Sequence, residues 1–129
     1  MKITTFNPLI VTKDADAAIA LFETLGFVRR HTIVVGPENG TSEEKRVTSV
    51  RMKDPNGFYV DIAQSKLPRD MTLIRMNVDD FDEAYAFLSE KGFKNLMGEN
   101  RSVETKSNKS AVMVSPSGFI FDLCQHIKK

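Results

Sequence analysis

The sequence predicts an α+β fold of two βαβββ modules in tandem, and an internal repeat is the main reason. A Pro-Gly turn that leads into a short apolar strand with one aspartate occurs at Asp54–Ile62 and again at Ser115–Leu123. Upstream of each turn, an amphipathic stretch starts at an aspartate and ends in Gly-Phe, at 14–27 and 80–93. Such a repeat indicates a duplicated supersecondary unit. The strands of one module are too few to close a barrel, so we expect one curved mixed sheet with the helices on its outer face.

The first module, residues 1–66, reads as a strand, a helix and three further strands. The β-branched run Phe6–Thr12 predicts a strand, and Pro8 should lie at its start or on an edge because proline lacks the ladder donor. Asp14 is a good N-cap, and apolar residues at helical spacing extend the expected helix to Leu25. The remaining strands are expected at 27–35, 45–53 and 58–63.

The second module, residues 70–129, repeats this order after a connection at 64–69. A strand is expected at 72–78, and a helix should run from Asp80 to Lys91. Glu83 follows Asp80 at the spacing of a capping box, with aspartate in the Ser/Thr role. Weaker strand patterns follow at 95–97, 103–107, 111–114 and 119–126.

The two modules differ mainly in the segment Gly36–Glu44, which has no counterpart in the second half. It contains proline, two glycines and acidic residues without apolar periodicity, so it predicts a long loop. Mobile loops beside binding pockets commonly act as lids, and this is the role we expect for it.

Composition narrows the classes of partner. A chain of 129 residues with 41% hydrophobic content is expected to form one domain, 1–129, made of the two modules. A net charge of +1 gives no electrostatic reason to expect nucleic acid or an anionic membrane as a partner. The sequence shows no membrane-spanning apolar run and no signal-peptide pattern. The single cysteine, Cys124, excludes an intrachain disulfide, fits the cytoplasm, and is expected to be a buried inert thiol.

With these paired motifs, the whole chain resembles the vicinal oxygen chelate superfamily, which includes glyoxalase I, extradiol dioxygenases, fosfomycin-resistance transferases and bleomycin-resistance proteins. The resemblance implies a small-molecule cavity between the modules, often completed by dimerisation, so we expect a small-molecule ligand and a homodimer. The segments that carry the resemblance, besides the two turns, are Thr12–Asp14, Leu25–Phe27, Val78–Asp80 and Lys91–Phe93.

Metal-dependent members of this superfamily bind a divalent ion with four side chains, and the corresponding positions here are Asn7, Asp61, Leu73 and Asp122. Leu73 has no lone pair, and the Asn7 amide is a poor ligand for transition metals, which favour imidazole. We therefore expect no cofactor and no transition metal, although the remaining oxygens leave weak Mg²⁺ or Ca²⁺ binding open. Neither His31 nor His126 falls at a ligand position, and the sequence does not define their roles.

Strand alternation places Tyr59 and Asp61 on one face of their strand, and the resemblance implies that this face lines the cavity. A buried Asp61 should pair with Arg51 or Arg75, or else stay protonated. The full set of expected ligand-binding residues is Asn7, Arg51, Tyr59, Asp61, Leu73, Arg75 and Asp122.

Three functions remain open at this point. The first is a metal-independent binding protein of the bleomycin-resistance type for a small, aromatic or cationic molecule. The second is an isomerase or lyase that uses Asp61 or Asp122 as a proton-transfer base. The third is a small regulatory module without a pocket. No motif identifies the ligand or substrate.

Overall fold

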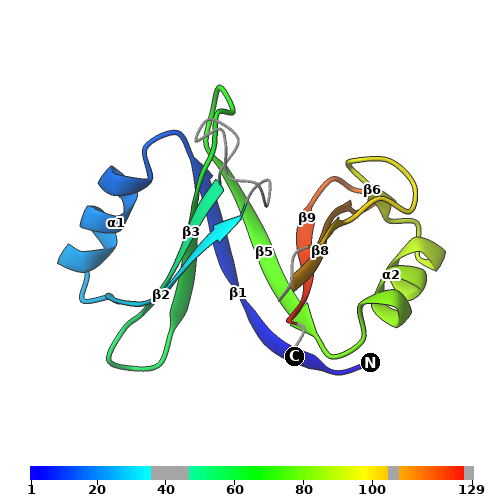
Figure 1. The fold of residues 1–129 in the computed structure, drawn as a ribbon, viewed down its shortest axis with the longest axis horizontal. Coiled ribbons are helices and arrows are strands. Elements are labelled where there is room, and N and C mark those ends of the chain that lie inside the picture. Colours follow the sequence, from blue (N-terminus) through cyan, green and yellow to red (C-terminus); the bar gives the residue numbers. More distant parts are fainter. Residues whose placement is uncertain (36–46, 105–107, 127–129) are drawn as a thin grey trace. The chain divides into compact units, whose positions relative to one another are not determined.

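A computed structural model describes residues 1–35, 47–104 and 108–126 of the chain (Figure 1). The chain divides into two compact units: a first unit, Asn7–Thr72, and a second unit formed by Met1–Phe6 together with the chain from Leu73 onward. Each unit contains one helix and a mixed sheet, so the predicted α+β fold of two βαβββ modules is confirmed. The loop expected at Gly36–Glu44 lies outside the described residues.

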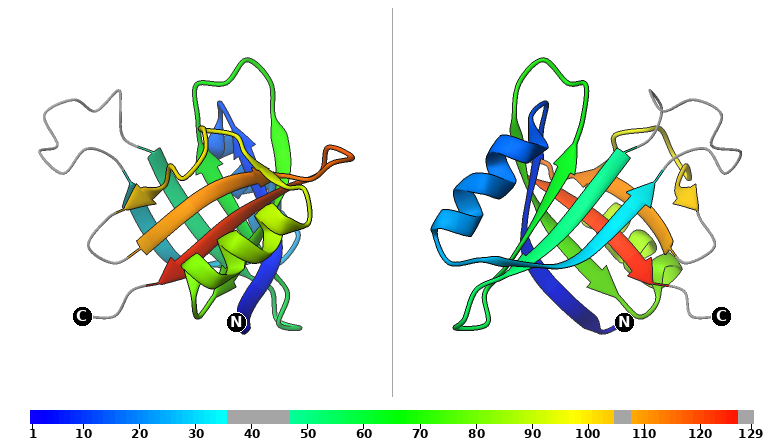
Figure 2. Two further views of the ribbon diagram at one scale, coloured as in Figure 1. Left: turned by 90° about the vertical axis from the view of Figure 1, so that its right-hand side faces the viewer. Right: turned by 60° about the vertical axis from the view of Figure 1, so that its left-hand side comes forward.

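In the first unit the strand order is β2-β3-β4-β1. The antiparallel pairs are β2 with β3 and β3 with β4, whereas β1 runs parallel to β4. Helix α1 packs against these strands (Figures 1 and 2). The elements are β1 (Ile3–Thr12), α1 (Ala15–Thr24), β2 (Val28–Val35), β3 (Val47–Lys53) and β4 (Tyr59–Gln64).

Helix α1 forms where its capping residues and apolar spacing predict it. The Asp14 side chain accepts a hydrogen bond from the Ala17 amide at 3.1 Å, and Gly26 takes the left-handed conformation after the helix, with φ at 102°. The buried face of α1 packs on alternate residues of β3 and β4, in a core made of Ala15, Ile19, Val50, Met52, Val60 and Ile62. The residues between these on the two strands therefore face away from α1.

Strand β1 departs from the prediction because it begins at Ile3, so Pro8 lies inside it. Of the two placements expected for Pro8, the start of the strand is wrong. The parallel ladder from β1 to β4 nevertheless begins at Leu9, directly after the proline. The first part of the strand belongs to the second unit, where the Asp79 amide donates to the Lys2 carbonyl at 3.0 Å.

In the second unit β5, β9, β8 and β6 are neighbours in that order, and β7 also pairs with β8. The β5–β9 pair is parallel, and β8 is antiparallel to β9, β6 and β7. Strand β6 has two residues, one fewer than expected at 95–97, and β7 is described at Val103–Glu104, while the rest of its expected range lies outside the described residues. The elements are β5 (Met71–Val78), α2 (Phe81–Glu90), β6 (Lys94–Asn95), β7 (Val103–Glu104), β8 (Asn108–Val114) and β9 (Ile120–His126).

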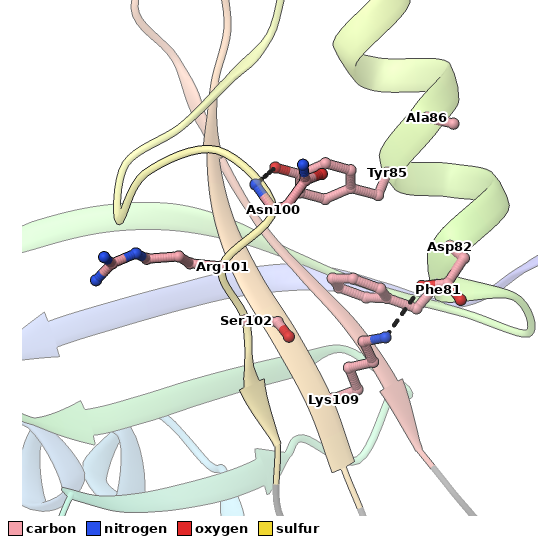
Figure 3. A pocket seen from close by; sticks show the side chains of 8 residues that line it. All are labelled: Phe81, Asp82, Tyr85, Ala86, Asn100, Arg101, Ser102 and Lys109. Carbon is pink, nitrogen blue, oxygen red and sulfur yellow. Dashed lines mark hydrogen bonds and ion pairs between the residues drawn. The ribbon is translucent and has the colours of Figure 1, made fainter.

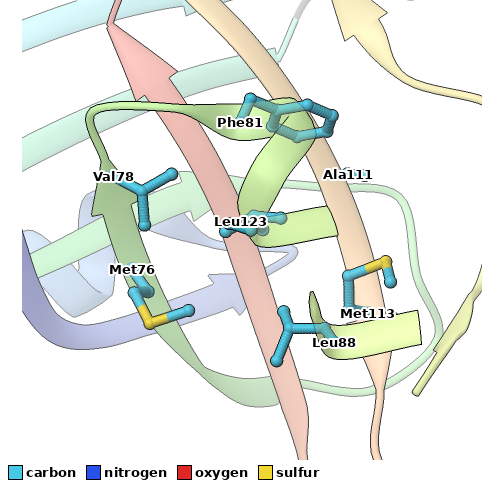
Figure 4. Close-up of a cluster of buried hydrophobic side chains, with 8 residues drawn as sticks. Met76, Val78, Phe81, Leu88, Ala111, Met113 and Leu123 are labelled. Carbon is cyan, nitrogen blue, oxygen red and sulfur yellow. The ribbon is translucent and has the colours of Figure 1, made fainter. Parts of the chain in front are cut away.

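Helix α2 lies against β8 and β9 and buries the core of the second unit (Figures 2 and 4). Asp80 caps it by accepting the Glu83 amide at 3.1 Å, as predicted. The reciprocal half of the capping box is absent, because the Glu83 carboxylate binds the Met1 ammonium group instead. The buried core residues are Met76, Val78, Phe81, Ala84, Leu88, Ala111, Met113 and Leu123.

Neither helix of the described chain is long and apolar enough to cross a membrane, since each has ten residues.

Candidate functional site

The central feature of the first unit is the ion pair between Asp61 and Arg51. The two residues lie directly opposite each other in the antiparallel β3–β4 ladder, on the face that α1 does not cover. Arg51 donates from Nε to Oδ1 and from Nη2 to Oδ2 of Asp61, both at 2.9 Å. The Asp61 side chain is only 1% exposed, and that of Arg51 is 23% exposed. A buried carboxylate thus has both oxygens bound by one guanidinium fork, which stabilises its ionised form.

Asn7 and Tyr59 complete this cluster. Arg51 Nη2 also donates to Asn7 Oδ1 at 3.1 Å, and the Asn7 amide nitrogen donates to the Pro8 carbonyl at 3.0 Å. The Arg51 guanidinium carbon lies 5.4 Å from the centroid of the Tyr59 ring. The first unit therefore brings together Asn7, Arg51, Tyr59 and Asp61, the four expected site residues that it contains.

The second unit holds a corresponding pair, Arg75 and Asp122. These residues are opposite each other in the parallel β5–β9 ladder. Arg75 Nε donates to Asp122 Oδ2 at 3.0 Å, and its Nη2 lies 3.0 Å from the same oxygen. The side chains are 16% and 11% exposed. Leu73, on the same strand as Arg75, is buried. Of the two Asp122 oxygens, the arginine contacts Oδ2.

The two pairs are not copies of each other, although their aspartates lie at repeated positions. Asp61 receives its arginine from the antiparallel neighbour β3, and its parallel neighbour β1 places Leu9 opposite it. Asp122 receives Arg75 from the parallel neighbour β5. The cation therefore comes from a different strand in each unit, so duplication of one ancestral pair does not explain the arrangement.

These side chains do not fit a transition-metal site. Leu73 has no donor atom, and both oxygens of Asp61 already accept hydrogen bonds from Arg51. Asp122 Oδ2 and the Asn7 oxygen are likewise bound by guanidinium groups. The described residues contain no cluster of three or more His, Cys, Asp or Glu side chains that could hold a metal ion.

In the part of the chain that the structure describes, the hydrogen bonds to the carboxylates of Asp61 and Asp122 come from arginines and not from a histidine or the cysteine. His31 and His126 are both exposed, on β2 and at the end of β9. Cys124 is buried, as expected, and its Sγ lies 3.7 Å from the Asp122 carbonyl oxygen.

The second unit also contains a pocket that sequence reasoning missed (Figure 3). It has a volume of about 310 Å³, at the lower end of the range for small-molecule sites. Its aromatic wall comes from α2, where the sequence indicated only an apolar face. The lining residues are Phe81, Asp82, Tyr85, Ala86, Asn100, Arg101, Ser102 and Lys109.

Polar contacts hold this pocket in shape. The Tyr85 hydroxyl accepts hydrogen bonds from the Asn100 amide at 2.8 Å and from Asn95 Nδ2 at 3.3 Å. Lys109 Nζ lies 3.0 Å from Asp82 Oδ1 and 5.0 Å from the centroid of the Phe81 ring. The hydrogen bond to Asp82 raises the pKa of Lys109, against the effect of desolvation. The only sequence signal for this pocket was a tyrosine hydroxyl on an otherwise apolar helix face.

Comparison with known proteins identifies the fold. No protein-family model matches the chain, and no curated protein matches it by sequence. A glyoxalase/bleomycin resistance protein/dioxygenase superfamily member from Vibrio splendidus is similar in structure, with a TM-score of 0.58 and 17% identity over 95% of this chain and 98% of the other. A protein from Staphylococcus aureus gives a TM-score of 0.60 at 13% identity, with both chains fully covered.

A glyoxalase I variant from Zea mays is also similar, with a TM-score of 0.64 and 17% identity over 96% of this chain. The present chain spans only 43% of that protein. Identities this low establish the fold and leave the activity open. The chain therefore has the vicinal oxygen chelate fold of the glyoxalase, bleomycin-resistance and dioxygenase proteins.

Proposed function

We propose that the chain binds a small organic molecule at the face of the first unit that carries Asp61 and Arg51, without a transition metal. The observation that carries this proposal is the bidentate ion pair in which Arg51 binds both carboxylate oxygens of the buried Asp61. A metal-dependent enzyme would need those oxygens as metal ligands. A binding protein can instead use the ion pair as a rigid polar surface that orients its ligand. The fold supports the proposal, because it is shared with bleomycin-resistance proteins. Weak Mg²⁺ or Ca²⁺ binding is not part of it, since both carboxylate oxygens of Asp61 and Oδ2 of Asp122 are bound by arginine.

A thermal-shift screen of small aromatic, cationic and anionic compounds tests this function. Asp61→Asn should weaken binding of a hit by about 1–3 kcal/mol, the usual range for a lost charged hydrogen bond. Ala86→Trp, which should fill the separate pocket on α2, is the matched control and should leave affinity unchanged. If Ala86→Trp abolishes binding and Asp61→Asn does not, the ligand site is the α2 pocket and the proposal fails. If no compound binds, a regulatory module without a ligand replaces it.

A second candidate is an isomerase or lyase, and the asymmetry between the two pairs favours Asp122 as its base. Of the two Asp122 oxygens Arg75 contacts Oδ2, and Oδ1 accepts no hydrogen bond from the described residues. Asp61 offers no comparable oxygen. Proton exchange of a bound carbonyl compound in D₂O, followed by NMR, should then be lost in Asp122→Asn while binding persists. Exchange that survives this substitution excludes Asp122 as the base.

We include a homodimer in the proposal because of the family resemblance, and a cytoplasmic location because of the single cysteine. Sedimentation at several concentrations tests the dimer, because a genuine dimer dissociates by mass action on dilution. A sedimentation coefficient that stays monomeric across tens of micromolar would remove it.

A further inference from the structure

The cluster around Asp61 continues into a row of side chains at the end of β3 and β4. Lys53 lies opposite Tyr59 in the β3–β4 ladder and opposite Val28 in the β2–β3 ladder. Residues directly opposite each other in a sheet share a face. Lys53 is also on the same face as Arg51, since the two are separated by one residue of the strand. This face therefore carries an ammonium group between a phenol and an exposed valine, 60% accessible.

Two cations converge on one ring in this row. Lys53 Nζ lies 5.3 Å from the centroid of the Tyr59 ring, and the Arg51 guanidinium carbon lies 5.4 Å from the same centroid. Asp61 forms its ion pair with the arginine. Asp54, the acid next to Lys53 in the chain, instead accepts the amides of Asn56 and Phe58 within its turn, at 3.1 and 2.8 Å.

The charge of Lys53 is therefore not balanced by any acid in the part of the chain that the structure describes. Lys53 forms no ion pair with any residue that the structure describes, and the Tyr59 hydroxyl forms no hydrogen bond with them. The Tyr59 residue is 38% exposed, so both donors are within reach of a ligand. An ammonium group beside a second cation, without an acidic partner among the described residues, attracts an anion.

We propose that Lys53 and Tyr59 form the subsite for the negative group of a small organic monocarboxylate, whose apolar part lies toward Val28. The inference rests on the proposed binding function and reverses the expected charge of its ligand. The carboxylates that suggested a cationic ligand form ion pairs with Arg51 and Arg75, whereas the Lys53 ammonium group has no acidic partner among the described residues. A monoanion matches one unpaired ammonium group, and the phenol hydroxyl donates a second hydrogen bond to it.

Three probes of similar shape and different charge test this inference by isothermal titration: benzoate, benzylamine and benzyl alcohol. Benzoate should bind at least about ten-fold more tightly than the other two, because charged hydrogen bonds favour it. Lys53→Met, which keeps the length of the side chain, should weaken benzoate binding about ten-fold. Tyr59→Phe should weaken it about two- to ten-fold while the ring is retained. Lys53→Arg should keep most of the affinity, and Lys94→Met on β6 is the control.

The outcomes separate this inference from the proposed function. Preference for benzylamine, or benzoate binding that ignores Lys53→Met, overturns the anionic subsite and leaves small-molecule binding at Asp61 intact. Failure of all three probes at millimolar concentration also overturns the subsite, and the compound screen then decides the wider function independently. Benzoate binding that weakens equally in Lys53→Met and Lys94→Met reflects general charge and counts against the subsite. Loss of benzoate affinity confined to Lys53→Met and Tyr59→Phe supports it.

Discussion

Arg51 on β3 donates hydrogen bonds to both carboxylate oxygens of Asp61 on the neighbouring strand β4, each at 2.9 Å. This contact makes Asp61, the most buried acidic side chain that the structure describes in the first unit, one half of an ion pair. Its geometry also determines what happens when one partner is removed, because a buried carboxylate without a cation is far costlier than no carboxylate.

Removal of Arg51 alone should therefore be severe. Arg51→Met leaves the Asp61 charge buried and should lower the free energy of unfolding by about 3–5 kcal/mol, measured by urea denaturation. The double variant Arg51→Met/Asp61→Leu removes both charges and should recover most of that loss.

The exposed pair Arg29–Glu23, with an N···O distance of 3.7 Å, is the matched control for this experiment. Arg29→Met should cost only about 0–1 kcal/mol, the usual range for surface pairs. A cost for Arg51→Met as small as that of the control, or a double variant no better than the single one, contradicts the account of Asp61.

The metal content of the purified protein is a second prediction. We expect no stoichiometric Zn, Ni, Fe or Mn by elemental analysis, because Leu73 has no donor atom and guanidinium groups bind the aspartates. One equivalent of any of these metals per chain, lost in Asp61→Ala, would show that the ligands lie elsewhere than the four aligned positions.

The glycines that follow the two helices give a prediction that compares the modules. Gly26 and Gly92 have positive φ values of 102° and 94°, so alanine at either position should cost about 1–2 kcal/mol of unfolding free energy. A Cβ at Gly92 would lie 3.0 Å from Pro116 Cγ, whereas at Gly26 the nearest atom, Pro55 Cδ, is 3.9 Å away. Gly92→Ala should therefore destabilise the protein more than Gly26→Ala. Equal melting temperatures for the two variants would mean that the Pro116 contact relaxes without cost.

The ion pair at the α2 pocket predicts a dependence on alkaline pH. The hydrogen bond to Asp82 raises the pKa of Lys109 above its ordinary value of 10.5. A raised folded pKa means that the ion pair contributes fully below the unfolded pKa and loses its contribution as the pH rises through the folded value. The melting temperature of the wild type should thus exceed that of Lys109→Met by a small margin at pH 8, since the pair is partly solvated. The margin should shrink above pH about 10.5. A constant margin from pH 8 to 11 would exclude this contribution.

Local signals in the sequence were sufficient for the order of elements. Asp14 and Asp80 cap helices because a side chain needs only the amides of the next turn, and Gly26 and Gly92 end them because a left-handed residue needs no distant partner. Local signals also placed Asp61 and Asp122 on strands correctly, because the turn before each aspartate and the alternation of side chains after it indicate a strand within a few residues.

The capping box and the start of β1 show where local signals fail. Glu83 has the spacing for a reciprocal cap, yet its carboxylate binds the ammonium group of Met1, distant in sequence. Strand β1 begins at Ile3 because the first residues find hydrogen-bonding partners beside β5, and Pro8 is tolerated since its ladder to β4 starts only at Leu9. Neither partner can be read from the neighbouring sequence.

By itself, the sequence determined the repeated βαβββ order, the helix caps and the two strand aspartates, all of which depend on contacts within a few residues. Only the tertiary structure decided which arginine meets which aspartate: Arg51 from an antiparallel neighbour for Asp61, and Arg75 from a parallel neighbour for Asp122. It also formed the α2 pocket, which joins a helix to the chain around Asn100 and to β8. Cross-strand register depends on pairing between segments far apart in the chain, and no local pattern of residues specifies it.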